Sequence, residues 1–225
     1  MKASNHQEIM KNTKECRKIV SLKLKAFHSQ MNPHFIFNSL NAIQYFITIN
    51  DKELSLNYLS IFSKLIRFNL KHLDRDSVSI SDEILMLNWY LSLQKLRYSD
   101  SFKYQVTIED KLIDSTAEIP THILQSLYEN IIEHAVYNQH IDHSIVVDFK
   151  SKNNQILVNT SYNYLPKKDS NHNKPPVYRK QITKWQDQIR LYNKFKKQSI
   201  QKKITFQKFG ILQGGKIQLI LPIVN

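Results

Sequence analysis

The spacing of apolar residues changes once along this chain, and that change limits the folds open to it. Up to about residue 98, apolar side chains recur every three or four positions, which is the period of an amphipathic helix. Beyond that point, segments such as 104–108 alternate apolar and polar residues, which is the period of a half-exposed strand. Helices that precede strands in this way predict an α+β fold. We place a domain boundary between residues 1–76, a helical part, and residues 77–225, a layered helix-and-sheet part.

Two helices are expected at the start of the chain. Residues 15–49 predict a helix that is interrupted or restarted at Pro33, with an apolar stripe at Ile36, Leu40, Ile43 and Ile47. Residues 52–73 predict a second helix, and the short turn between them should make the pair an antiparallel hairpin. Both helices are apolar on more than one face. We therefore expect a second copy to cover the outer faces, giving a dimeric four-helix bundle.

The elements expected after residue 80 mix helices and strands. Ser81 or Asp82 should cap a third helix that ends near Tyr98. The remaining elements, in chain order, are a strand at 104–108, a helix at 121–135, a strand hairpin at 144–149 and 155–160, a loop at 161–178, a basic helix at 179–198, and two closing strands (KITFQKF and KIQLILPI) around Gly214-Gly215.

The formal net charge of +13 lies in the last third of the chain. Residues 151–225 hold 15 of the 32 Lys and Arg residues but 2 of the 19 acidic residues. A basic segment favours an anionic partner such as a nucleotide, a nucleic acid, a lipid headgroup or an acidic protein surface. Aromatic residues in this segment could stack on bases, but they equally suit helix packing, so nucleic acid is not the expected partner.

Cysteine content and hydropathy favour a cytoplasmic setting. Cys16 is the single cysteine, so an internal disulfide cannot form. The first residues contain no apolar signal segment. Residues 26–50 carry no Asp, Glu, Lys or Arg, but they hold too many His, Asn and Gln side chains for a helix in hydrocarbon. We expect a soluble chain, which could be the cytoplasmic part of a longer, membrane-associated protein.

The stretch SQMNPHFIFNSLNAIQYF (29–46) presents a histidine in an unusual place. Asn32 can act as an N-cap and Pro33 as the first helical residue, where its missing N–H costs nothing. His34 then lies in the first turn, where the helix dipole favours an anion attached to its ring. A continuous helix kinked at Pro33 would also present His34. The alternative is a helix-start histidine that simply faces water.

Several motifs in order resemble the autolysin-sensor class of sensor histidine kinases. QMNPHFIFNSLNAI resembles the phosphoacceptor pattern Q-I-N-P-H-F-L-F-N-x-L-N. Residues 78–98 are similar to the segment V-x-L-x-x-E-L…Y-L-x-I-E-x-x-R-F of this class, and residues 120–134 to its box P-x-x-L-Q-P-L-V-E-N-A-I-K-H-G. Together these motifs cover about residues 22–135.

The resemblance implies a dimeric phosphoacceptor hairpin followed by an ATP-binding α/β sandwich of the gyrase and heat-shock-ATPase (GHKL) type. It implies ATP and Mg²⁺ as cofactors, and a second copy or a related kinase and a response regulator as partners. His34 matches the phosphoacceptor and Asn38 the asparagine one turn later. Glu129 and Asn130 match the acidic and Mg²⁺-binding positions of the nucleotide box, and His134 matches its basic position.

The nucleotide-binding part departs from that pattern after residue 135. Asn159 stands nearest the aspartate of the expected D-x-G-x-G strand, and no glycine follows it. The best placement of the expected glycine-rich lid is 181–191, which keeps Arg190 but holds no glycine. Glycine allows backbone N–H groups to fold around phosphates. We therefore predict weak or absent ATP binding by the isolated chain.

Two functions remain open at this point. One is an active kinase that moves the γ-phosphoryl group of ATP to His34 and then to a response regulator. The other is a catalytically impaired pseudokinase or scaffold that dimerises and accepts phosphate in trans, or binds a regulator. His134, His140 and His143 could also suggest a metal site, but no cysteine or well-spaced carboxylate joins them, so we expect these histidines to be exposed.

Overall fold

The computed structural model describes residues 33–73, 75–113, 115–121, 123–137, 141–165, 177–195, 199–209 and 212–224. The chain divides into two compact units, Met1–Arg75 and Asp76–Asn225. The helix expected before Pro33, the capping role of Asn32 and part of the loop expected at 161–178 lie outside the described residues.

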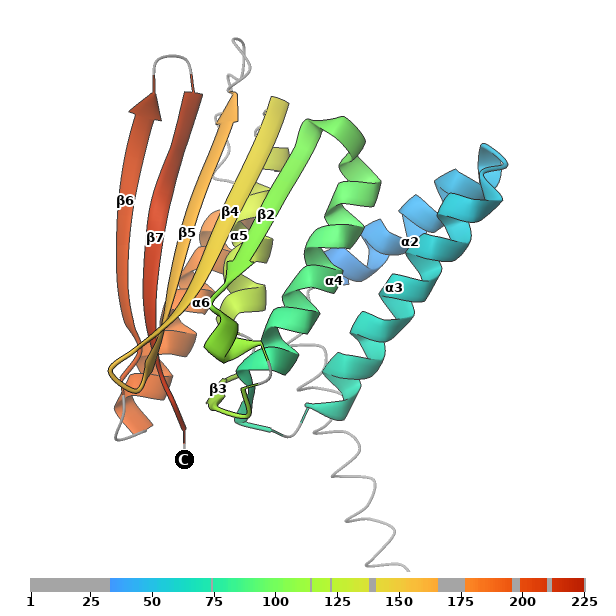
Figure 1. Cartoon of the computed structure of the whole chain (residues 1–225). Helices are drawn as coiled ribbons and strands as arrows, with labels where there is room; N and C mark the ends of the chain where they lie inside the picture. The colour runs from blue at the N-terminus through green and yellow to red at the C-terminus, as the bar shows by residue number, and fades with distance from the viewer. Residues whose placement is uncertain are drawn as a thin grey trace, which may run out of the picture. The chain divides into compact units, whose positions relative to one another are not determined.

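The described part of the first unit is a helical hairpin of α2 (Pro33–Thr48) and α3 (Lys52–Lys71) (Figure 1). Asn50 adopts a left-handed backbone conformation, with a φ of 57°, in the connection. Asp51 caps α3, since its carboxylate accepts a hydrogen bond from the Leu54 N–H at 3.0 Å. The chain thus reverses over a very short turn, and the predicted antiparallel hairpin is confirmed.

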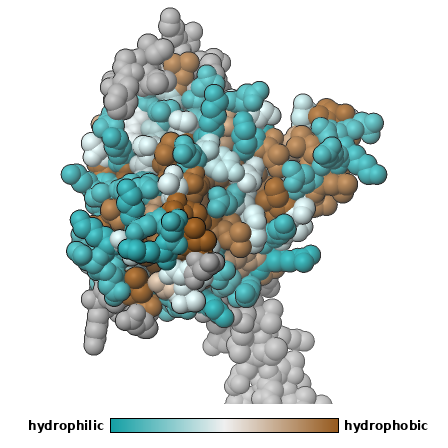
Figure 2. Space-filling model, viewed as in Figure 1, coloured by the Kyte–Doolittle hydropathy of each residue, from teal (hydrophilic) through white to brown (hydrophobic). Residues whose placement is uncertain are grey.

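Tyr58 fixes the packing between the two helices. Its hydroxyl donates to Ser39 Oγ at 3.4 Å, and its ring lies 5.7 Å from that of Phe46. The stripe predicted on α2 is not this inner face, because Leu40 is 49% and Ile47 63% exposed. Hydrophobic side chains are therefore left on the surface of the hairpin, as Figure 2 shows.

The second unit contains a five-stranded mixed sheet in the order β2-β4-β5-β7-β6 (Figure 1). Only β2 and β4 of this sheet run parallel, and the other neighbours are antiparallel. The strands are β2 (Phe102–Ile108), β4 (Ile141–Lys152), β5 (Gln155–Leu165), β6 (Gln201–Phe209) and β7 (Leu212–Pro222), while β1 (Ser77–Ser79) and β3 (Glu118–Pro120) pair separately.

Three helices cover one face of this sheet: α4 (Ile80–Tyr98), α5 (Ile123–Tyr137) and α6 (Val177–Phe195) (Figure 1). Ser92 of α4 bonds the Tyr104 hydroxyl of β2 at 2.9 Å. Trp185 of α6 donates to the Ile123 carbonyl of α5 at 3.0 Å. Alternate strand residues are buried under this helical layer (Ile145, Val147, Phe149, Ile156, Val158, Thr160, Ile217, Leu219 and Leu221). The predicted α+β class is confirmed.

Three local predictions were wrong. Ser79 caps α4, with its hydroxyl accepting from the Asp82 N–H at 3.1 Å, in place of Ser81 or Asp82. β5 continues to Leu165, so the loop predicted from residue 161 starts later. Gly214 and Gly215 lie inside β7, not in the turn before it. The reason is space: a Cβ on Gly214 would lie 2.0 Å from the Tyr162 carbonyl oxygen.

Candidate functional site

His34 lies in the first turn of α2, directly after Pro33, and it is exposed. The amide nitrogen of Asn38 lies 3.1 Å from Nδ1 and 3.2 Å from Nε2 of the imidazole. The spacing of four residues places both side chains on one helical face. An amide NH₂ group can donate to whichever ring nitrogen lacks a proton. Asn38 can therefore orient the imidazole in either tautomer.

The aromatic neighbours of His34 do not enclose it. Phe35 is 4% exposed, and its ring lies 6.3 Å from that of Phe62 on α3. Phe37 is 66% exposed. Successive helical residues point in different directions, so one phenylalanine serves the core and the other faces outward. The exposed His34 ring is therefore accessible to a second molecule.

A second group of polar side chains is buried along α5, in the other unit. Gln125 Nε2 donates to Glu129 Oε1 at 3.0 Å, and Asn130 Nδ2 donates to the Ser126 carbonyl at 2.7 Å. Gln125 Oε1 and Asn130 Oδ1 have no hydrogen-bond partner. An unpaired buried amide oxygen costs ~1–3 kcal/mol, so each of these oxygens is available to a ligand.

Burial keeps two carboxyl groups of this unit largely protonated at neutral pH. Desolvation raises the pKa of Glu129 to about 8, although the hydrogen bond from Gln125 acts to lower it. Desolvation also raises the pKa of Glu83 to about 8, although a hydrogen bond from the backbone of Leu124 acts to lower it. Glu83 belongs to the first turn of α4 and Leu124 to the start of α5, so this contact ties the two helices together.

Asn130 fits the magnesium role that the resemblance implies. Its amide orientation is fixed, because Nδ2 is engaged by Ser126, and Oδ1 is the hard oxygen that Mg²⁺ prefers. His134 lies one turn further along α5, but its side chain is outside the described residues. The pairing of Asn130 with His134 stays a prediction.

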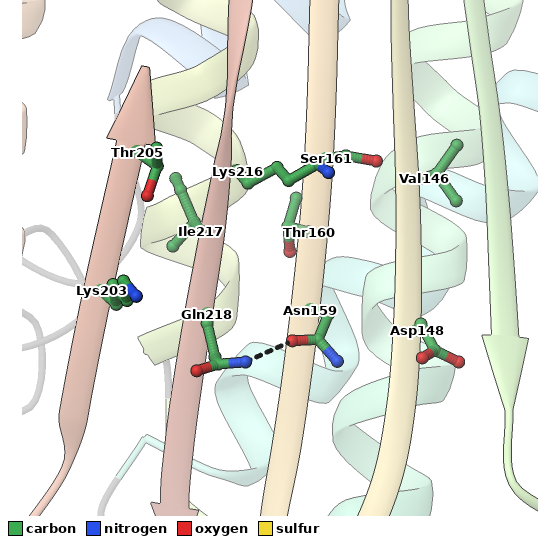
Figure 3. A pocket seen from close by; sticks show the side chains of 10 residues that line it. All are labelled: Val146, Asp148, Asn159, Thr160, Ser161, Lys203, Thr205, Lys216, Ile217 and Gln218. Carbon is green, nitrogen blue, oxygen red and sulfur yellow. Dashed lines mark hydrogen bonds between the residues drawn. The ribbon is translucent and has the colours of Figure 1, made fainter. Parts of the chain in front are cut away.

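The residues at the expected adenine end do not fit a nucleotide base. Thr160, not Asn159, faces the helical layer, and its hydroxyl bonds the Tyr128 hydroxyl of α5 at 2.8 Å. Asn159 lies on the opposite face of β5, where it accepts from Gln218 Nε2 at 3.0 Å (Figure 3). A strand alternates its side chains, so Asn159 cannot join Asn130 in one site.

Tyr162 further fills this end of the sheet. A Cβ on Gly215 would lie 2.8 Å from the Tyr162 hydroxyl, so the ring lies directly against the glycine backbone. The cavity lined by Tyr162, Ile132 and Ala135 measures about 10 Å³. Small-molecule sites usually measure ~300–1,000 Å³. This particular cavity is therefore too small to hold an adenine ring.

The segment predicted as a lid is a helix. Residues 181–191 lie within α6, where Trp185 and Ile189 are buried. Arg190 is exposed, and its guanidinium pairs with Asp187 at 3.0 Å on the same helix. This segment forms a regular helix rather than a phosphate-binding loop, since it lacks the glycines that such a loop needs. Arg190 is nevertheless available on the surface.

Thr160 and Glu83 are the site residues that sequence reasoning missed. The buried alternation Ile156, Val158, Thr160 would have identified the first, because it continues the inward register of β5. Glu83 stands at the fixed glutamate of the pattern V-x-L-x-x-E-L, which is the signal that could have identified it, although its burial (1% exposed) is seen only in the structure. The prediction that His143 is exposed was wrong. Its side chain, at the start of β4, is buried (7% exposed) and packs against the Tyr98 ring, whose centroid lies 6.5 Å away.

Two kinds of feature are absent from the described residues. No group of three or more His, Cys, Asp or Glu side chains there could hold a metal ion. No described helix combines the length and the apolar character needed to cross a membrane.

Comparison with known proteins identifies relatives of the chain. Residues 22–102 match the histidine kinase family model. The sensor protein LytS of Staphylococcus epidermidis is 33% identical over 141 residues, which is 63% of this chain and 23% of that protein. The sensor histidine kinase/phosphatase LytS of Staphylococcus aureus is 32% identical over 117 residues, 52% of this chain and 20% of that protein. The chain thus spans less than a quarter of the length of these relatives.

Solved structures with similarity include two histidine kinases. Acinetobacter baumannii AdeS has a TM-score of 0.37 and 8% identity, covering 94% of this chain and 98% of that one. The catalytic domain of ThkA has a TM-score of 0.40 and 10% identity, covering 65% and 95%. The resemblance to sensor histidine kinases of the autolysin-sensor class, first identified from the motifs, is confirmed by the family match and the LytS relatives.

Proposed function

We propose that this relative of the LytS sensor histidine kinases is a dimerising phosphoacceptor in a two-component pathway, which receives its phosphoryl group from ATP bound to a second, intact kinase chain. The observation that carries the proposal is the exposed His34 imidazole, held by Asn38 on the first turn of α2. Relatives named as sensor kinases support the pathway.

The chemistry at His34 is a phosphoryl transfer in which the chain supplies the nucleophile. The unprotonated ring nitrogen attacks the γ-phosphorus, the bond to the ADP oxygen breaks, and the proton on the other ring nitrogen is free to leave to solvent. Asn38 orients the ring for this attack. An aspartate of a response regulator would then receive the phosphoryl group.

We assign the donor to another chain because two contacts at the nucleotide end of this chain disfavour a bound base. Thr160 is engaged by Tyr128, and Tyr162 lies against Gly215. A hydrophobic patch on the hairpin supports pairing with such a chain: Leu40 and Ile47 of α2 and Leu56 and Leu59 of α3 are each at least 45% exposed. A second copy or a related kinase would cover them.

An active kinase is the second candidate, and one observation favours it. Asn130 Oδ1 is buried, unpaired and fixed in orientation, as a magnesium ligand would be. A chain that binds no nucleotide would have no function for an unpaired, buried amide oxygen at this position.

Labelling with γ-labelled ATP·Mg²⁺ distinguishes the two. The chain is incubated alone, and with a LytS-class kinase whose own phosphoacceptor histidine is replaced. We expect label on this chain in the mixture only, its loss in His34→Gln, and labelling slowed by ~10–100-fold in Asn38→Ala, since small misplacements of a reacting group have effects of that order. Gln44→Ala, at an exposed residue of α2 outside the motif, is the control and should label at the normal rate.

Label on the chain incubated alone would select the active kinase. Absence of label in the mixture, under conditions where the two chains form a heterodimer, would overturn the phosphoacceptor proposal. Label that persists in His34→Gln would also overturn it.

A further inference from the structure

The sheet face that the helices leave open carries a depression of about 410 Å³ (Figure 3). The side chains around it come from β4, β5, β7 and β6 and form two cross-strand rows. One row is Lys203, Gln218, Asn159 and Asp148, and the other is Thr205, Lys216, Ser161 and Val146. Residues directly opposite each other share a face. The depression therefore lies on the opposite side of the sheet from α5 and its polar group.

The charges in the depression are unbalanced. Asp148 is neutralised by Lys150, whose Nζ lies 2.9 Å from Oδ2. Lys203 and Lys216 form no ion pair with another described residue. They are diagonal neighbours on β6 and β7, because Lys203 is opposite Gln218 and Lys216 is opposite Thr205. The backbones of such neighbours lie ~7–8 Å apart, so one anionic ligand can reach both flexible side chains and interact favourably with each ammonium group.

Neutral donors surround the two lysines. Lys216 has Thr205 on one side and Ser161 on the other, each with a hydroxyl, and Figure 3 shows it extending toward Ser161. Asn159 accepts from Gln218 through Oδ1, which leaves its own NH₂ group as a donor. The depression thus offers two cations, two hydroxyls and an amide, and its carboxylate is already paired. Phosphate oxygens accept hydrogen bonds from all of these groups.

We propose that this depression binds a soluble ligand bearing two or more phosphate groups. The volume is in the range of small-molecule sites. Among the described lining residues, Val146 is the apolar side chain that is exposed, and no aromatic residue lines the depression. The centre of a protein interface would be richer in aromatic residues, and a membrane-binding surface would need an apolar rim. A polyphosphate ligand needs neither aromatic residues nor an apolar rim around its site.

Calorimetric titration of the full chain with inorganic tripolyphosphate, at physiological ionic strength, tests this site. The wild-type chain should bind it with one dominant site. Lys203→Gln/Lys216→Gln should weaken binding at least ~tenfold, because both direct charges are removed.

The chain is strongly basic, so its overall charge needs a matched control. Lys71→Gln/Lys152→Gln removes the same charge at two exposed positions outside the depression and should leave affinity unchanged. Equal weakening by both double variants would mean that net charge alone attracts the anion, and would overturn the site. No binding by the wild type would do the same, as would lysine-dependent binding to anionic lipid vesicles without tripolyphosphate binding.

Discussion

The carboxyl group of Glu83 is buried, with one hydrogen bond and almost no access to water. Its side chain is 1% exposed, and Oε1 has no partner. Burial raises its pKa from an ordinary value of 4.5 to about 8, against the hydrogen bond from Leu124. The folded chain therefore holds this carboxyl protonated at pH values where the unfolded chain has lost the proton.

The sign of the resulting pH dependence follows from linkage. A carboxyl group whose pKa is higher in the folded chain than in the unfolded chain stabilises the fold fully below about pH 4.5, and this contribution is lost as the pH rises to about 8. Glu129 acts in the same direction. The free energy of unfolding should fall over this window, by at most about 1.4 kcal/mol per pH unit for each group. Glu83→Gln keeps an acceptor for Leu124 and stays neutral, so it should reduce the fall.

Urea unfolding at pH 5.5 and pH 8 measures this difference. Glu83→Gln should gain stability relative to the wild type at pH 8. Asp82→Asn, on the same turn of α4, is the control and should keep the wild-type pH dependence. An unchanged pH dependence in Glu83→Gln would contradict the assigned protonation.

At the scale of single residues, the sequence predicted contacts that are local and missed those set by register. The His34–Asn38 contact follows from the four-residue spacing of one helical face. Asn159 was assigned to the nucleotide side, but a shift of one residue reverses the face of a strand, and Thr160 lies there instead. Register depends on the partner strands, which spacing within β5 does not define.

At the scale of elements, β7 needs two adjacent glycines because β5 passes unusually close to it. A Cβ on Gly214 would meet the Tyr162 backbone oxygen at 2.0 Å, and one on Gly215 would meet the Tyr162 hydroxyl at 2.8 Å. The first obstacle is backbone and cannot move alone. The second is the far end of a side chain, although the Thr205 carbonyl also lies 3.0 Å away.

A double-mutant cycle separates these two obstacles. Gly214→Ala and Gly215→Ala should each destabilise the chain by ~1–3 kcal/mol, as overpacked sites do. Tyr162→Ala should relieve part of the loss in Gly215→Ala and none of the loss in Gly214→Ala. Urea midpoints of the single and double variants give the coupling energies. Equal rescue of both glycine variants would contradict the distinction between backbone and side-chain contact.

Elements with a clear period were predictable from sequence, and their ends were less so. α3, α4 and the β4–β5 hairpin follow from apolar spacing and from Asn153-Asn154, both of which adopt positive φ as a tight turn requires. The glycines were assigned to a turn because glycine usually marks one. Their actual role, the close approach to Tyr162, depends on a strand about 50 residues earlier in the chain.

At the scale of the whole molecule, the hairpin leaves more apolar surface exposed than its own contacts use. Leu40 and Ile47 on α2, and Leu56 and Leu59 on α3, lie outside the inner face that Tyr58 occupies. Their spacing of seven and three residues keeps each pair on one helical stripe. A soluble monomer rarely exposes such a stripe, and a partner hairpin would bury it.

Leu40→Lys/Leu59→Lys should therefore convert a dimer into a folded monomer. Both side chains are 45% or more exposed, so the charges cost the isolated hairpin little, but they would be buried unpaired in a four-helix bundle. Analytical ultracentrifugation of the full chain measures the mass, and circular dichroism checks that the helices remain. Asn41→Lys/Asn57→Lys adds the same charge at exposed polar positions and should stay dimeric. A wild-type chain that sediments as a monomer at tens of micromolar, a typical concentration for weak dimers, would remove the second copy as the partner and leave the related kinase as the chain that covers this stripe.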